Sequence, residues 1–247
     1  MIKSHEEIEL MRIAGKIVGD THNYLKEFIK PGITTKELDQ LAHDFIISQG
    51  AIPSFLNYDG YPASICTSVN EEVVHGIPGN RVLQEGDIIS IDIGACYKGY
   101  HGDSAWTYPV GSIDDEKKYL LEHTEKALFE GLNNIKPGNR IGDIGYAIEQ
   151  YALKHKLGVV KELVGHGVGK HLHETPDVPN YGDKNKGMIL RNGMTIAVEP
   201  MLNLKTANIY LLDDDWTIVT ADNSPSAHFE HTVLVTKDGF EILTKRW

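Results

Sequence analysis

The sequence contains only two cysteines, Cys66 and Cys96, in 247 residues. This number is too small for the disulfide scaffold of a secreted protein and fits a reducing compartment. No segment approaches the roughly 18 consecutive apolar residues of a membrane span. The first residues, MIKSHEEIELMR, mix acids and bases before any apolar run and therefore do not resemble a signal peptide. We expect a cytoplasmic protein without a membrane partner.

Basic residues are also scarce. The chain has 24 Lys and Arg against 35 Asp and Glu, for a formal net charge of −11. Nucleic-acid phosphates are bound by clustered Lys and Arg, so this balance argues against a stable nucleic-acid partner. The hydrophobic content of 41% is ordinary for a folded protein. The length favours a single domain over 1–247 with a sizeable core.

Two helices are predicted at the start of the chain, over 4–30 and 34–50. Each begins with Ser or Thr followed three residues later by Glu, the pattern of a capping box, and each ends near a glycine. Segments rich in β-branched residues follow, and a turn at Lys98-Gly99 joins two of them. The predicted strands are 63–69, 87–97 and 103–110.

The second half repeats this order. After Asp114, helices are predicted up to Pro137-Gly138 and over about 141–157. FIKPG at 28–32 matches NIKPG at 134–138, and LQEGDIISID at 83–92 aligns without gaps to LRNGMTIAVE at 190–199. Single Pro-Gly junctions match by chance, but these matches keep the same order. The repeat predicts two pseudo-symmetric halves, about 1–110 and 111–247, with a site between them that draws matching ligands from each.

Four acidic residues are predicted to enter one site from four strands. Asp92 lies in the apolar segment ISIDIGA, the turn after it places Asp103 on the same face, and Glu199 and Glu230 stand in TIAVEP and HFEHTVLV. Any one of them alone is more often a strand-end residue facing water. Four carboxylates together need protons or cations, and Lys and Arg are sparse nearby. We predict two divalent cations, Mn²⁺, Fe²⁺ or Co²⁺, with Zn²⁺ also compatible.

The segment GHGVGKHLHE contains His166, His171 and His173. A single histidine is more often structural, but three within eight residues of a glycine-rich loop favour a site. His166 is the candidate ligand because His75 has the same His-Gly-aliphatic pattern in the first half. His75 and His173 are then free to donate hydrogen bonds to a substrate or a developing oxyanion. His171 could equally well support a neighbouring residue or face the solvent, so it is not included among the candidate site residues.

These residues resemble the methionine aminopeptidases over nearly the whole chain. The motifs that carry the resemblance, in the family's order, are SICTSVNEEVVHGIP, GDIISIDIGA, YHGDSAW, GHGVGKHLHE, AVEPM and SAHFEHTVLVT. The chain lacks a cysteine-rich N-terminal extension and a long insertion between His173 and Glu230, as in the short type I bacterial form. The fold that the resemblance implies is the pita-bread fold, an α/β (α+β) arrangement of two helix–helix–sheet halves around a central antiparallel sheet.

The resemblance also implies roles for individual residues. A water molecule activated by the cations attacks the peptide bond, with Glu199 as proton shuttle. His173 stabilises the tetrahedral intermediate, and His75 hydrogen-bonds the peptide nitrogen beyond the scissile bond. The implied metal ligands are Asp92 for one cation, His166 and Glu199 for the other, and Asp103 and Glu230 bridging both.

The implied activity is removal of the initiator methionine from nascent polypeptides, with a preference for a small second residue. The implied partner is therefore the N-terminal Met of nascent peptides. The protein would be near the ribosome only transiently, and we expect it to be a monomer. The methionine pocket is implied to consist of Tyr58, Tyr61, Cys66, Leu172 and Trp216. Phe55 fits this pocket and the core equally well, and Gly94 stands where many family members carry threonine.

Two alternatives remain. A prolidase or Xaa-Pro aminopeptidase shares the five ligands, but such enzymes usually carry a further N-terminal domain, for which a first helix at residue 4 leaves no room. A non-catalytic binding protein on the same fold typically loses ligands, whereas this chain retains all five together with His75 and His173.

Overall fold

A computed structural model of the chain describes residues 1–246. Its helices are α1 His5–Lys26, α2 Thr35–Ser48, α3 Asp115–Leu132 and α4 Ile141–Lys154, with a short 3-10 helix η1 at Tyr58–Gly60. The strands are β1 Ile52–Pro53, β2 Ile65–Val69, β3 Glu72–Val74, β4 Ile88–Tyr97, β5 Tyr100–Pro109, β6 Gly158–Val159, β7 Gly165–Gly167, β8 Glu174–Val178, β9 Thr195–Val198, β10 Met201–Asn203, β11 Ile209–Leu211, β12 Ile218–Thr220, β13 Ser226–His228, β14 His231–Val235 and β15 Phe240–Ile242.

The predicted helices are present, and the first two begin as expected. Ser4 and Thr34 are the N-caps of α1 and α2, and both capping boxes form with the glutamate three residues later. The prediction for α1 was too long, since the helix ends at Lys26. Pro31 accounts for part of this difference because proline disfavours the helical conformation in the residue before it. The other three helices also end earlier than predicted, at Ser48, Leu132 and Lys154.

The strands form two main antiparallel sheets. β4 pairs with β1, β2 and β5, and the order in the other sheet is β15-β14-β9-β7-β8. The predicted hairpin register is confirmed, because Gly94 faces Asp103. The two sheets meet where the backbone N–H of Glu230 donates to the carbonyl of Ala105 at 2.8 Å. Smaller sheets, β13-β10-β6 and β11-β12-β3, complete the strand layer.

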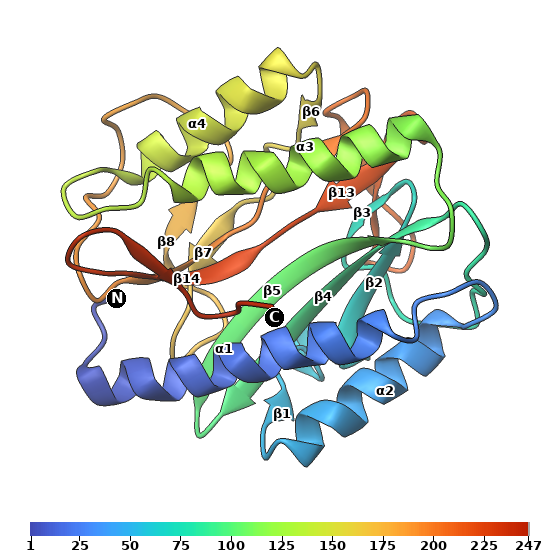
Figure 1. Ribbon diagram of the computed structural model, residues 1–247, viewed down its shortest axis with the longest axis horizontal. Helices are drawn as coiled ribbons and strands as arrows, with labels where there is room; N and C mark the ends of the chain where they lie inside the picture. Colours follow the sequence, from blue (N-terminus) through green and yellow to red (C-terminus); the bar gives the residue numbers. More distant parts are fainter. Residues whose placement is uncertain (247) are drawn as a thin grey trace.

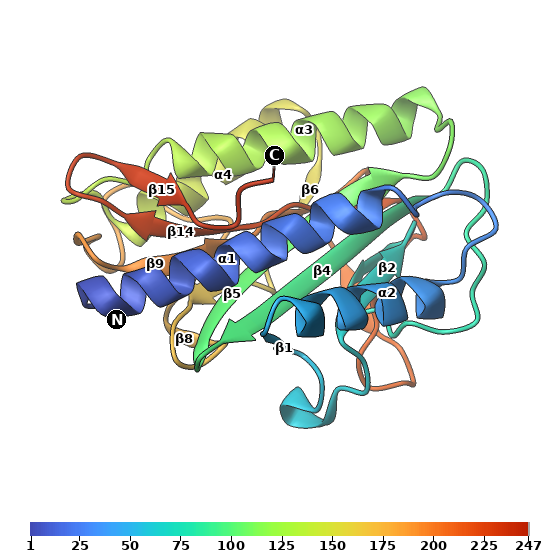
Figure 2. The same ribbon diagram turned by 60° about the horizontal axis from the view of Figure 1, so that its bottom comes forward.

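The helices cover one face of these sheets. Figures 1 and 2 show α1 and α2 packed along the first-half strands and α3 and α4 along the second-half strands, on the same side of the layer. α1 approaches β5 closely, since a β-carbon on Gly102 would lie 2.8 Å from the Cα of Gly15. The expected arrangement of two helix–helix–sheet halves around antiparallel sheets is confirmed.

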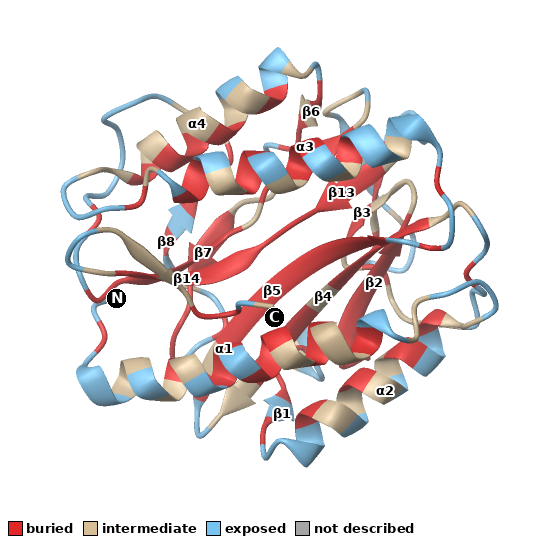
Figure 3. Ribbon diagram, viewed as in Figure 1, coloured by how far each residue is buried: buried red, intermediate tan, exposed pale blue. Residues whose placement is uncertain are grey.

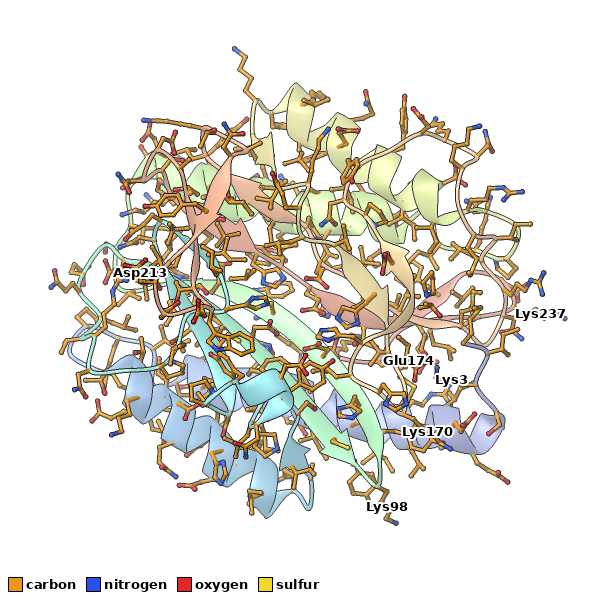
Figure 4. The ribbon with its side chains drawn as sticks, turned by 180° about the vertical axis from the view of Figure 1, so that it is seen from behind. Lys3, Lys98, Lys170, Glu174, Asp213 and Lys237 are labelled. Carbon is orange, nitrogen blue, oxygen red and sulfur yellow. The ribbon has the colours of Figure 1, made fainter. Side chains whose placement is uncertain are left out.

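The main hydrophobic core lies between the helices and the strands, and it takes residues from both halves, from Ile17 to Val235. In Figure 3 the buried faces of the helices are turned toward the strands and the exposed faces away from them. No helix within residues 1–246 is both long and apolar enough to cross a lipid bilayer. Seen from behind in Figure 4, the four long helices lie beyond the strands, and the near face of the strand layer carries loops and side chains.

Candidate active site

The four acidic residues converge where the two main sheets meet. Asp92 lies in β4 and Asp103 in β5, as predicted. The prediction that the other two also stand in strands is wrong by one residue each, because Glu199 directly follows β9 and Glu230 directly precedes β14. Pro200 explains the end of β9, because proline has no N–H to donate to the next strand. Asp92 and Glu199, which the repeat placed at equivalent positions, come from opposite halves of the site.

The acids and histidines form overlapping groups whose potential ligand atoms lie within 4.8 Å of one another. These groups are Asp92 with Asp103 and Glu230, His166 with Glu199 and Glu230, and Asp103 with His166 and His173. Asp103, His166 and Glu230 each belong to two of these groups, so the groups overlap in one continuous cluster. The structure thus brings together all five predicted ligands, and it also places His173 within ligand distance.

Burial makes this cluster electrostatically unfavourable by itself. It raises the pKa of Asp92 and that of Glu199 to about 7. The pKa values of Asp103 and Glu230 rise well above the ordinary range through burial and the neighbouring carboxylates. Among the described residues, the ion-pair contacts of these acids are with histidines rather than with Lys or Arg. Positive charge must come from elsewhere if the four carboxylates are to ionise together.

Several buried polar atoms of the cluster have no hydrogen-bond partner in the described part of the chain. They are Oδ1 of Asp92, Oδ1 of Asp103, Oε1 of Glu230 and Nε2 of His228. Unpaired polar atoms at such depth are costly unless something satisfies them. Oxygen donors with imidazole and no thiolate suit hard or borderline divalent cations, so the residues present fit the predicted pair of ions.

His166 is held in the form that a metal ligand requires. Its Nδ1 donates to the carbonyl of Gly167 at 2.9 Å, which leaves the lone pair on Nε2. That nitrogen lies 3.5 Å from Oε1 of Glu199 and 3.7 Å from Oδ2 of Asp103. Burial lowers the pKa of His166 and so favours the neutral imidazole.

His75 and His173 line the same cavity as the acids. His75 has a left-handed backbone with φ of +61°, which is unusual for a residue with a side chain, and burial lowers its pKa to about 4. The ring of His173 meets that of His166 edge-on, with centroids 4.3 Å apart. His171 is exposed and does not line the cavity.

The cavity has a volume of about 600 Å³. One wall carries the acids and histidines, and the other is an apolar cluster in which Trp216 meets Tyr61 edge-on with centroids 5.0 Å apart. The residues predicted to form the methionine pocket all line this cavity, together with Phe55: Tyr58, Tyr61, Cys66, Leu172 and Trp216. Phe55 lines the cavity and is also buried, so it belongs both to the predicted pocket and to the core.

Sequence analysis did not identify His228. Its Nε2 lies 3.6 Å from Oε2 of Glu199 and 3.9 Å from Oε2 of Glu230, and the residue is buried in the cavity wall. The signal was present in SAHFEH, because residues two apart in an extended segment point to the same face. Met201 also lines the cavity and likewise stands two residues from one of the acids, Glu199.

Comparisons with known proteins agree with this geometry. Residues 9–237 match metallopeptidase family M24. Methionine aminopeptidase 1 of Bacillus subtilis (strain 168) is 58% identical over 243 residues, covering 98% of each chain. The crystal structure of methionine aminopeptidase from Rickettsia prowazekii superposes with a TM-score of 0.98 at 44% identity and covers 99% of each chain. This likeness confirms the expected pita-bread fold.

Xaa-Pro peptidases match less completely. The prolidase from Pyrococcus horikoshii OT3 has a TM-score of 0.82 at 25% identity, and this chain covers 64% of it. The same layer of helices and strands is therefore shared, but a third of that enzyme has no counterpart here.

Proposed function

Because the chain belongs to metallopeptidase family M24, among its methionine aminopeptidases, we propose that it removes the initiator methionine from nascent polypeptides with a small second residue. The observation that carries this proposal is the cavity itself, in which an apolar wall faces a buried cluster of carboxylates and imidazoles. Hydrolysis needs the polar wall, and recognition of an unbranched thioether needs the apolar one.

The residues that would hold two divalent cations are Asp92, Asp103, His166, Glu199 and Glu230. We propose Mn²⁺, Fe²⁺ or Co²⁺, with Zn²⁺ also compatible with these donors. When bound, such cations lower the pKa of a coordinated water and polarise the carbonyl of the substrate.

The remaining chemistry falls to side chains of the cavity. Glu199 takes a proton from the attacking water and passes it to the leaving amine. His173 donates a hydrogen bond to the oxygen that becomes negative in the tetrahedral intermediate. His75 hydrogen-bonds the peptide nitrogen of the second residue, which orients the scissile bond.

The apolar wall selects the side chain of the first residue. Tyr61 and Trp216 offer aromatic edges to the thioether, and Cys66 offers a second polarisable sulfur atom. Burial raises the pKa of the Cys66 thiol well above its ordinary value, so it packs as a neutral group. Leu172 and Tyr58 close the remaining sides. A shorter or branched side chain fills this space less well.

The substrate sets the place of action. We propose a cytoplasmic monomer that acts on the N-terminus of nascent chains and is near the ribosome only transiently.

The test is hydrolysis of Met-Ala-Ser, Met-Leu-Ser, Leu-Ala-Ser and Ala-Pro-Ser by metal-stripped protein, with and without added Mn²⁺ or Co²⁺. We expect metal-dependent release of methionine from the first peptide and little reaction with the others. Cleavage of Met-Leu-Ser at an equal rate would contradict the preference for a small second residue. Cleavage only before proline would move the chain to the prolidases, and no cleavage would favour the binding-protein alternative.

A further inference from the structure

A hydrogen bond joins the two halves of the chain across the cavity wall. The hydroxyl of Tyr58 lies 2.8 Å from Nδ1 of His173, although the two residues are 115 positions apart in sequence. Their rings meet edge-on with centroids 5.2 Å apart. Both residues line the cavity. The contact therefore connects an apolar-wall residue to a histidine of the polar wall.

The backbone around Tyr58 is built to present this side chain. Asn57 and Asp59, on either side of it, have left-handed conformations with φ of +64° and +48°, which Asn and Asp adopt more readily than other residues with side chains. The N–H of Asn57 donates to the carbonyl of Tyr61 at 2.9 Å, and the N–H of Tyr58 donates to that of Phe55 at 2.9 Å. These turns hold the phenol in place over His173.

The direction of the hydrogen bond decides which nitrogen of His173 carries a proton. A neutral imidazole has one N–H and one acceptor nitrogen. Burial raises the pKa of the Tyr58 phenol, and the charges of Asp59 and Asp103 add to this effect, so the hydroxyl keeps its proton and can donate it. If Nδ1 of His173 accepts, the proton of the ring is on Nε2. A group that stabilises an oxyanion must donate, and Nε2–H is then the available donor.

We propose that Tyr58 is a positioning residue, whose hydroxyl donates to Nδ1 of His173 and holds this ring with Nε2–H available to the carbonyl oxygen of the substrate. This role rests on the proposed function, because it requires His173 to act on the tetrahedral intermediate. It is separate from the contact of the Tyr58 ring with the methionine side chain, since only the hydroxyl takes part.

The first test is Tyr58→Phe, which removes the hydroxyl and keeps the ring. We expect kcat for Met-Ala-Ser to fall roughly 10- to 100-fold, less than the roughly 100- to 1000-fold typical of removing an oxyanion donor altogether, because the ring of His173 remains. KM should change little, because the lost interaction acts in the transition state. Binding of Mn²⁺, measured by calorimetry, should be unchanged.

The chain offers a matched control. The hydroxyl of Tyr119 lies 2.9 Å from Nδ1 of His155, a tyrosine–histidine pair between α3 and the end of α4 that does not line the cavity. Tyr119→Phe removes the same atom from the same kind of contact. We expect it to retain the kcat of the unmodified protein.

A second test asks whether Tyr58 acts through His173. In a His173→Ala background, Tyr58→Phe should cause no further loss of kcat, because the group that it positions is absent. A phosphonate analogue of methionine, which imitates the tetrahedral intermediate, should bind Tyr58→Phe more weakly by the same factor as kcat falls. Free methionine should bind both forms equally.

Three results would overturn the proposal. Tyr58→Phe could retain full kcat, or it could lower kcat equally with and without His173, as a plain wall residue would. It could instead weaken Mn²⁺ binding, which would make His173 a metal ligand, a place that its distance from Asp103 and His166 allows. Failure of the unmodified protein to release methionine is a different outcome, which would remove the proposed function and this role with it.

Discussion

A β-carbon on Gly94 would lie 2.7 Å from Cε1 of Phe55, closer than side-chain carbons approach one another. Gly94 stands in β4 opposite Asp103, and Phe55 lines the cavity. The phenyl ring thus uses the space that a larger residue at position 94 would need. A larger residue at position 94 would therefore require both Phe55 and Ser54 to move.

Gly94→Ala is expected to lower the free energy of unfolding by about 1–3 kcal/mol, the usual cost of overpacking a filled region. Its backbone is not left-handed, so the loss would come from the contacts with Phe55 and Ser54. Urea unfolding measures this change in the free energy of unfolding. Gly239→Ala is the control, because nothing lies within 4 Å of its added carbon. Equal stability of both variants would show that Phe55 moves aside freely.

Asp103→Asn is expected to abolish tight Mn²⁺ binding, because it removes a charge shared by two ligand groups. The metal-free variant should be more stable than the metal-free parent, since one buried carboxyl group no longer competes with its neighbours. Calorimetry measures the binding of Mn²⁺, and thermal unfolding with and without chelator measures the stability of the metal-free proteins. His75→Ala is the comparison, and it should keep the cations and lower turnover. An active, well-folded Asp103→Asn protein would argue strongly against the bridging role.

The segment that carries His173 is tied to the start of the chain. Nζ of Lys3 lies 2.7 Å from Oε2 of Glu174, and both side chains are largely buried. Figure 4 shows the two residues side by side, with Lys237 well apart from them. Lys3→Met should lower the free energy of unfolding by up to about 3 kcal/mol, because it leaves the largely buried carboxylate with only the N-terminal ammonium, 3.8 Å away, and the N–H of His171. Lys237→Met, at an exposed site, is the control.

This ion pair should also give stability a dependence on pH. Burial raises the pKa of Glu174, but the Lys3 ammonium and the N–H of His171 outweigh it and hold the pKa below 4.5. The stabilisation is therefore present above about pH 4.5 and is lost as the pH falls through the lower, folded value. Urea unfolding between pH 7 and pH 3 should show a steeper acid loss in the parent than in Lys3→Met. Parallel curves would contradict the pairing.

The buried imidazole of His22 should make stability depend on pH over a second range. Burial lowers its pKa from 6.5 to about 3, and its nitrogens lie 3.0 Å from the hydroxyl of Tyr108 and 2.9 Å from the carbonyl of Ser104. The unfolded chain binds a proton between these pH values and the folded chain does not, so stability falls as the pH drops from about 6.5 toward 3. One such group contributes a slope of up to about 1.4 kcal/mol per pH unit. His22→Gln should flatten the curve over this range, and an unchanged slope would mean that His22 protonates in the folded protein.

Local signals were sufficient for much of the fold. The capping boxes at Ser4 and Thr34 satisfy N–H groups within the same helix turn, so they depend on no distant contact. The two-residue turn after Tyr97 sets the register of its hairpin, which placed Asp103 opposite Gly94. The internal repeat identified Asp92 and Glu199 as equivalent positions.

The sequence by itself determined the helices, the hairpin and the residue types that converge on the site, because periodicity, capping and turn chemistry act over a few residues. Only the tertiary structure decided which side chains share the cavity. Three contacts illustrate this point, because each joins residues that are far apart in the sequence: Tyr58 with His173, Lys3 with Glu174, and His228 with Glu199. Such contacts arise only when strands and loops distant in sequence pack together, and no local pattern encodes the distance between their side chains.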